Sequence, residues 1–511
     1  MIKEQIRKSQ RMQTTINILT GIFVLIFNMG VGFFISPYIV RTLGEEANGY
    51  TQLANNFVTY ASLITLAFNS MAGRFISVCY HKNDIDGVKK YFSSTMICNI
   101  AITMLLLPIA MLIIFNLERI IKIENADIFD VKVLFLCVFL NFFVSLLTSV
   151  YGIAMFVKNV LYISNVISAI RSVVNATVLL IVFTMLPPRI FYVSIVGVLL
   201  TIIFSIVKYC LHGKLMPNLK ISSKDFSIIA VRSMVSSGIW NTINQCGNLL
   251  MTGLDLIVTN LLVSPASMGV LAVAKTIPTA ITNLASTLNV NLAPSLTIDW
   301  AKGDRKTLLK TLRSGMKISS VIVSIPLMVF CAYGIEFYTL WMPSLDAKQL
   351  TILSLLTCMA LIPWAGPQAL NNIFTATNKL KVNTITFCIA GMVNVILVLV
   401  LLKTTNLGIY AVAGTSSVIT IIRCISVTAP YIAHLMDLKW YTFYKDALLS
   451  TLCCGINFVT SKTIAAFVHT DSWVSLIFAV IVSGIVSFCV DVWVILNKDE
   501  RKLLIEKVKR K

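Results

Sequence analysis

The chain has 511 residues, of which 57% are hydrophobic and only 13% are charged. Its mean hydropathy is +0.85. Soluble domains carry roughly a quarter charged residues, so this composition excludes a soluble protein and predicts an integral membrane protein. The length suffices for about fourteen helices of roughly 20 residues with short connections, which leaves almost nothing for a soluble domain.

The formal net charge of +20 could suggest nucleic acid as a partner, but the placement of the charge excludes it. Lys and Arg gather at the ends of apolar segments, as in the cytoplasmic loops of polytopic membrane proteins. The 12 cysteines lie mostly within apolar runs without metal-ligand spacing, so we expect small buried residues. The sequence has no paired carboxylates, nucleophile motif or phosphate-binding glycine loop, and we therefore expect no enzyme, cofactor or metal.

Residues 1–15 are basic and lead into a long apolar run without a small-residue cleavage site, which predicts an uncleaved first span. The expected spans are 15–40, 48–79, 93–115, 131–156, 160–184, 189–211, 235–262, 266–294, 314–334, 349–372, 382–402, 408–433, 446–467 and 474–496. The even-numbered loops and the tail carry most of the Lys and Arg residues, whereas the odd-numbered loops are poor in them or balanced by acids. This alternation supports the count and predicts two cytoplasmic termini.

One stretch, Gly49–Ser94, aligns without a gap on Gly269–Ser314, about 220 residues further along. The loops that follow the helical part also coincide, with Asp84 on Asp304. A chance match between two amphipathic helices is the alternative, but in both copies a polar-striped span runs into a basic loop. Transporters are often built from such homologous halves.

The two copies lie in the second and eighth spans, six spans apart, so the halves have the same orientation in the membrane. The sequence therefore predicts an all-α membrane protein with two six-helix lobes as parallel repeats. We expect lobes at 1–212 and 213–440, followed by two further helices and a basic cytoplasmic tail at 441–511.

Several spans carry polar residues every three or four positions, so that these residues share one helix face. Such faces are not expected to point at lipid, and they predict the lining of a polar cavity. The asparagines that we assign to this lining are Asn55, Asn241, Asn244, Asn248 and Asn283. The alternative is that the stripes only join helix to helix through hydrogen bonds.

Three cations, Arg171, Lys275 and Arg423, lie near the middle of expected spans. A cation at that depth costs at least roughly 2.5–3.5 kcal/mol, so we expect a compensating use. Asp255 is the clearest carboxylate at similar depth and cannot neutralise all three. We therefore predict a water-filled cavity between the lobes that selects an anion, and arginine suits phosphate through paired hydrogen bonds.

Two further arginines, Arg74 and Arg232, lie nearer the cytoplasmic ends and would form a funnel into the cavity, or simply anchor the helices at the interface. Pro278 follows Lys275 by one turn, and Pro363 and Pro367 interrupt the tenth span. Because proline frees a backbone carbonyl and bends a helix, these positions predict bent helices beside the cavity.

The sequence PYIVRTLG at Pro37–Gly44, followed by Glu45 and by Asn48–Tyr50, resembles the signature at the end of the first span of bacterial polysaccharide flippases. These flippases belong to the multidrug/oligosaccharidyl-lipid/polysaccharide exporter superfamily. Asp255 and the loop Lys302–Asp304 are also similar to that group. The second copy reads TNLL where the first reads RTLG, so the motif is not required symmetrically, and shaping a turn at the interface is the alternative role of its arginine.

The resemblance implies a flippase that moves undecaprenyl-pyrophosphate-linked oligosaccharide repeat units from the inner to the outer leaflet by alternating access. Its place would be the bacterial plasma membrane, and its pathway O-antigen, capsule or exopolysaccharide biosynthesis. Polysaccharide polymerase and chain-length machinery are the candidate protein partners. Asp255 is the candidate for ion coupling, either as a fixed partner of a cavity cation such as Lys275 or as a site for Na⁺ or H⁺.

Two other functions compete with this one. A cation-coupled multidrug exporter of the same superfamily would favour acidic cavity residues, whereas the buried charge here is mainly basic. An integral-membrane glycan polymerase or ligase would be expected to have a long external loop with catalytic charge, whereas the longest loops here are short and cytoplasmic.

Overall fold

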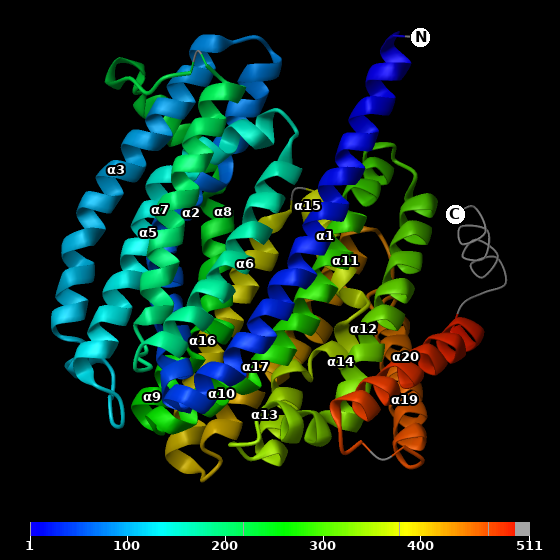
Figure 1. The fold of residues 1–511 in the computed structure, drawn as a ribbon. Helices are drawn as coiled ribbons and strands as arrows, with labels where there is room; N and C mark the ends of the chain where they lie inside the picture. The colour runs from blue at the N-terminus through cyan, green and yellow to red at the C-terminus, as the bar shows by residue number, and fades with distance from the viewer. Residues whose placement is uncertain (1, 218, 378, 469, 496–511) are drawn as a thin grey trace. The chain divides into compact units, whose positions relative to one another are not determined.

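A computed structural model describes residues 2–217, 219–377, 379–468 and 470–495 (Figure 1). All regular secondary structure in these residues is helical, which confirms the expected all-α membrane fold. The chain forms two compact units. Unit 1 runs to Cys246 and includes Ser264–Gly269, whereas unit 2 comprises Gly247–Val263 and the chain from Val270 onward. The expected lobe boundaries stay a prediction.

Unit 1 is built from long helices that lie side by side, as α3, α5 and α7 do in Figure 1. Its elements are α1 (Ile2–Leu43), α2 (Glu45–His81), α3 (Ile85–Phe115), α4 (Leu117–Ile120), α5 (Ile128–Val157), α6 (Leu161–Met185), α7 (Tyr192–Leu215), the short 3₁₀ helix η1 (Ser223–Asp225) and α8 (Ile228–Asn248), whose last residues belong to unit 2.

Unit 2 is centred on the long helix α12, which packs against α11, α13, α19 and α20. Its elements are the π-helix η2 (Leu249–Gly253), α9 (Asp255–Leu262), α10 (Pro265–Ala274, begun in unit 1), α11 (Thr276–Ala301), α12 (Arg305–Trp341), α13 (Ala347–Cys358), α14 (Leu361–Trp364), η3 (Pro367–Leu370), α15 (Asn371–Ala376), α16 (Leu380–Thr404), α17 (Ile409–Arg423), the π-helix η4 (Cys424–Thr428), α18 (Ala429–Leu435), α19 (Tyr444–Ala465) and α20 (Trp473–Ile495).

In the described part of the chain, 11 helical segments are long and apolar enough to cross a membrane. They correspond to the second to sixth, eighth, ninth and eleventh to fourteenth expected spans. The other three expected spans fall on α1, on α8 to α9 and on the short helices α13 to α15. The helical path of the chain therefore agrees with the expected series of spans.

The two copies of the repeat share the geometry of the loop that ends them. Asp84 caps α3 by accepting a hydrogen bond from the Gly87 amide at 2.8 Å, and Asp304 caps α12 by accepting one from the Thr307 amide at 3.0 Å. The residue before each aspartate has a left-handed backbone conformation, with φ of 57° at Asn83 and 72° at Gly303. Hydrogen bonds from Thr307 lower the pKa of the Asp304 carboxyl, as expected for an N-cap that works as a carboxylate.

Unit 2 contains the helix breaks that its prolines predict. The eighth span is interrupted at Lys275, where α10 ends and α11 begins. Pro278 has no N–H to donate to the carbonyl of Ala274, and the Ser354 hydroxyl lies 2.8 Å from that carbonyl and 2.7 Å from the Leu350 carbonyl, so it can donate to either. The equivalent stretch of the first copy, within α2, is a continuous helix. The tenth span is divided into α13, α14, η3 and α15 around Pro363 and Pro367.

Candidate functional site

An ion pair in unit 2 joins Asp255 and Lys275. The Lys275 ammonium donates to Asp255 Oδ2 at 2.7 Å and to the backbone carbonyl of Thr252 at 3.0 Å. The two side chains are only 7% and 18% exposed. The structure thus brings together two residues that the sequence singled out, in the arrangement of a fixed ion pair.

Both members of this pair stand at irregularities of the helical backbone. Asp255 begins α9 immediately after the π-helix η2 and Leu254, and Lys275 occupies the break between α10 and α11. Successive carbonyls of η2 accept hydrogen bonds from side chains, since Asn394 Nδ2 donates to Leu250 at 3.2 Å and to Met251 at 2.9 Å. Broken helices and π-turns of this kind expose carbonyl groups that hold a cation, which here is the lysine ammonium.

Arg171 has a different environment in unit 1. Its guanidinium donates from Nη2 to the hydroxyl of Thr201 on α7 at 2.6 Å, and that hydroxyl contacts Asn141 on α5. No carboxylate of the described residues lies within ion-pair distance of Arg171. Its guanidinium is therefore held by a neutral hydroxyl and not by a carboxylate.

Lys208 on α7 interacts electrostatically with Arg171, and the sequence analysis missed it. No described carboxylate pairs with Lys208 either. Lys208 lies near the end of the expected span 189–211, so a search for cations near the middle of spans does not find it. Two cations that approach each other without a counter-charge strengthen the positive field of unit 1.

Arg423 ends α17, directly before the π-helix η4. Its Nη1 donates to Asn383 Oδ1 at 3.0 Å, and its guanidinium lies 4.8 Å from the centre of the Phe387 ring. Asn383 belongs to the first turn of α16, next to Lys379 and Lys381. The guanidinium is therefore held near the basic end of this helix pair rather than at its midpoint.

The five asparagines assigned to the cavity lining, Asn55, Asn241, Asn244, Asn248 and Asn283, are all exposed in the structure, as are Arg74 and Arg232. Asn241 Nδ2 contacts Ser70 Oγ at 3.3 Å, whereas Asn55 Nδ2 bonds to the Thr51 carbonyl of its own helix at 2.9 Å. Exposed amides on membrane-spanning helices are compatible with a polar lining. That these residues and the three cations line one cavity stays a prediction.

The glycines that the repeat places in register lie against each other. A Cβ at Gly49 would stand 3.0 Å from the Cα of Gly269. A Cβ at Gly269 would in turn collide with the Glu45 carbonyl. Only glycine allows α2 and the start of α10 to approach so closely.

A long helical fold with membrane-length segments, broken helices in unit 2 and partly buried basic residues defines a polytopic membrane protein. The chain superposes on the inward-facing conformation of a multidrug resistance MATE family transporter of the MOP superfamily with a TM-score of 0.69 and 11% identity, over 83% of this chain and 98% of the other. It also superposes on the lipid II flippase MurJ in an inward closed conformation, with a TM-score of 0.65 and 15% identity, over 93% and 98% of the two chains. At these identities the likeness shows the fold alone.

The family is shown by sequence. Residues 15–297, more than half of the chain, match the family described as polysaccharide biosynthesis protein, and the chain belongs to this family. A Bacillus subtilis (strain 168) protein named uncharacterized membrane protein EpsK is 28% identical over 507 residues, which cover 98% of this chain and 99% of that protein. The expected membership of a polysaccharide biosynthesis family is thereby confirmed.

Proposed function

We propose that this protein is a flippase for undecaprenyl-pyrophosphate-linked oligosaccharide repeat units, which it moves from the inner to the outer leaflet by alternating access. Family membership over residues 15–297 carries the proposal, because it connects a transporter fold to polysaccharide biosynthesis. The product serves a surface polysaccharide such as O-antigen, capsule or exopolysaccharide. The protein works as a transporter rather than an enzyme.

The charge of unit 1 supports an anionic substrate. Among the described residues, the Arg171 guanidinium donates to the neutral hydroxyl of Thr201 and forms no ion pair, and Lys208 adds a second positive charge. A pyrophosphate would supply the missing negative charge, with arginine offering paired donors. A cationic drug would instead need a free carboxylate, and Asp255 is already paired with Lys275.

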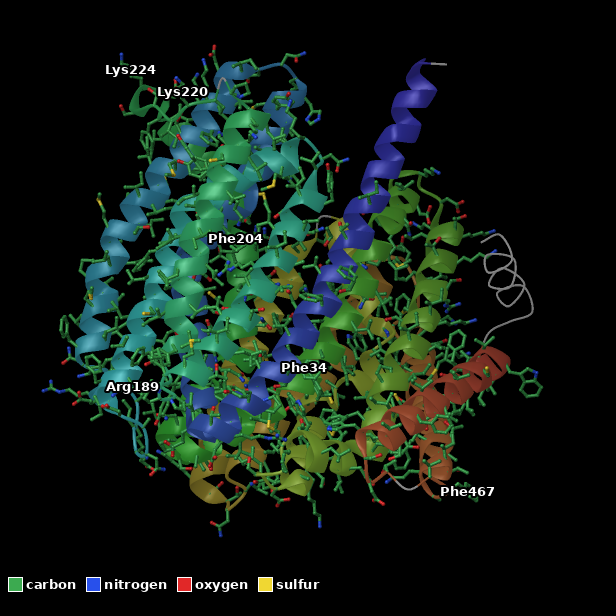
Figure 2. All side chains as sticks on the ribbon, viewed as in Figure 1. Phe34, Arg189, Phe204, Lys220, Lys224 and Phe467 are labelled. Carbon is green, nitrogen blue, oxygen red and sulfur yellow. The ribbon has the colours of Figure 1, made fainter. Side chains whose placement is uncertain are left out.

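We infer a plasma-membrane location with both termini in the cytoplasm. In Figure 2, Lys220 and Lys224 lie at one end of unit 1 and Arg189 lies at the other. The end that carries Arg189 also has a cavity of about 270 Å³ lined by acids including Glu45 and Asp130. Under the positive-inside rule the basic end is cytoplasmic and the acidic end is external. Polysaccharide polymerase and chain-length machinery would then meet the protein on its external side.

Reconstitution tests the proposal directly. Purified protein in liposomes that carry a fluorescent undecaprenyl-pyrophosphate oligosaccharide on one leaflet should transfer this lipid to the other, measured by its accessibility to a membrane-impermeant quencher. Transport of cationic dyes with no movement of the glycolipid would favour a multidrug exporter. Polymerised glycan in the liposomes would favour a polymerase.

A further inference from the structure

The two helices that follow the second lobe, α19 and α20, enclose a polar group that the proposed function does not use. Asp491 on α20, Asn457 on α19 and Ser324 on α12 are each 0% exposed. Asn457 Nδ2 donates to Asp491 Oδ2 and to Ser324 Oγ, both at 2.8 Å. Both N–H groups of the amide are therefore occupied, and they join three helices.

Three oxygen atoms of this cluster are left without a partner. They are Asp491 Oδ1, Asn457 Oδ1 and the hydroxyl of Ser461, one turn further along α19. An unsatisfied buried polar atom costs about 1–3 kcal/mol, and more where the group is charged. A closely packed helix pair with three such atoms points to a missing ligand.

No positive side chain of the described residues neutralises Asp491. The ion pairs of these residues do not include it. The titratable groups that face it are the thiols of Cys453 and Cys454 on α19, which supply no positive charge. Lys462 of the same helix donates to the Ala332 carbonyl of α12 at 3.2 Å. A bare carboxylate in this position would be a buried unpaired charge, which proteins avoid by neutralisation.

We propose that Asp491 is a proton-binding site within the membrane. A proton from solvent bonds to Asp491 Oδ1, and the resulting O–H donates to Asn457 Oδ1, which gives a neutral acid–amide pair. One proton thus gives a partner to two of the three unpaired oxygen atoms and removes the negative charge of Asp491. A metal cation fits less well, because it would need several more oxygens than the three that are free. This site is independent of the flippase proposal.

Infrared spectroscopy of the purified full chain tests the proposal. At neutral pH, protein with isotope-labelled aspartate should show the carbonyl stretch of a protonated carboxylic acid, and Asp491→Asn should lose it. Because asparagine mimics the neutral acid but has no proton to release, this variant should melt at the temperature of the parent only at about pH 4 and below, where an exposed aspartate is also protonated. Unfolding exposes Asp491 to water, where it releases its proton, so raising the pH should lower the melting temperature of the parent relative to Asp491→Asn. Asp471→Asn, at an exposed carboxyl between the same two helices, is the matched control and should keep the band.

Two results would overturn the proposal. One is the absence of any protonated aspartate band lost with Asp491. The other is a melting temperature that rises with Na⁺ but not with K⁺ in the parent and loses that response in Asp491→Asn, which would make this a metal-cation site. If Asp491→Asn fails to fold, Asn457→Ser serves to assign the infrared band instead. Loss of the amide should shift the carbonyl stretch of protonated Asp491. An unshifted stretch would contradict the proposed pair of Asp491 and Asn457.

Discussion

At the scale of single residues, Arg171 shows how a half-buried cation can be held without being neutralised. Its partner Thr201, whose hydroxyl in turn donates to Asn141, supplies an oxygen atom but no negative charge. Such an arrangement fixes the position of the guanidinium while its full charge persists. This is what a binding site for a substrate anion needs, and what a purely structural ion pair would not offer.

Replacing Arg171 by alanine should therefore leave the protein inserted but impair glycan export. The topology is set by basic loops that this change does not touch. Export should fall by about tenfold or more, since a hydrogen bond to a charged group is worth about 1.5–3 kcal/mol. Surface polysaccharide at native expression level is the readout. Lys224→Ala, which removes an exposed loop cation, is the control and should export normally.

The sequence identified Arg171, Lys275, Arg423 and Asp255 because a charge inside an apolar run is conspicuous. It could not identify their partners, since Asn141, Thr201 and Asn383 belong to other helices and are ordinary polar residues in the sequence. The pairing of Lys275 with Asp255 was one of two possibilities until the structure gave the distance of 2.7 Å. Contacts between helices depend on how the helices pack, and the local periodicity of the sequence does not determine that packing.

At the scale of helices, the contact of Gly49 with Gly269 makes a testable claim about spacing. Gly49→Ala would gain about 0.5–1 kcal/mol of helix propensity. It should nevertheless destabilise the protein by a net ~1–3 kcal/mol, because the added Cβ would stand 3.0 Å from a backbone atom. Gly152, also in a helix, has open space where its Cβ would be. A detergent melting curve should therefore move down for Gly49→Ala and stay unchanged or move up for Gly152→Ala, and equal shifts would count against the close approach.

The helix break beside Lys275 leads to a second prediction, about the hydrogen bond that the Ala274 carbonyl accepts. Ser354→Ala removes the hydroxyl that can donate to the Ala274 carbonyl, which Pro278 leaves without its helical partner. An unsatisfied buried carbonyl should cost about 1–3 kcal/mol of stability. Pro278→Ala restores an N–H, so the Ser354→Ala/Pro278→Ala double variant should recover part of the loss. Additive losses in the double-variant cycle would show that the serine does not replace the missing bond.

The helical elements were predictable to the extent that hydropathy and charge define them. Apolar length and the alternation of basic loops anticipated the series of spans, and proline anticipated the breaks in the eighth and tenth spans. The π-helix η2 within the seventh span was not anticipated, because no proline marks it. Its carbonyls are satisfied by Asn394 and Lys275 from other helices, so its stability is a tertiary effect.

At the scale of the whole molecule, the two copies of the sequence repeat, which predict homologous halves, differ at one informative place. The repeat puts Asn55 where the second copy has Lys275. The first copy is a continuous helix there, whereas the second is broken and carries an ion pair with Asp255. The two copies thus differ both in helix continuity and in charge. Coupling of transport to an ion gradient needs a charged group that can change its partner. The second copy, in which Lys275 pairs with Asp255, carries a candidate for such a group.

Asp255→Asn distinguishes the two roles that Asp255 could have. If the carboxylate is only the fixed partner of Lys275, the variant leaves a buried ammonium uncompensated and should lose about 3–5 kcal/mol of stability. The double variant Asp255→Asn/Lys275→Asn, which gives position 275 the residue of the first copy, removes both charges and should recover that loss. If the ion pair is only structural, this recovered protein should also transport as the parent does.

If Asp255 instead exchanges Lys275 for an incoming Na⁺ or H⁺, the double variant should recover its stability but not its gradient-driven transport. The double variant should then be stable and bind the lipid-linked oligosaccharide, yet move it at a rate that no longer responds to an imposed Na⁺ or H⁺ gradient. The measurement is glycolipid transfer in liposomes with each gradient applied in turn, beside the parent protein. A parent that responds to a gradient and a double variant that responds equally would exclude Asp255 as the coupling site, because no carboxylate would remain there to carry the ion.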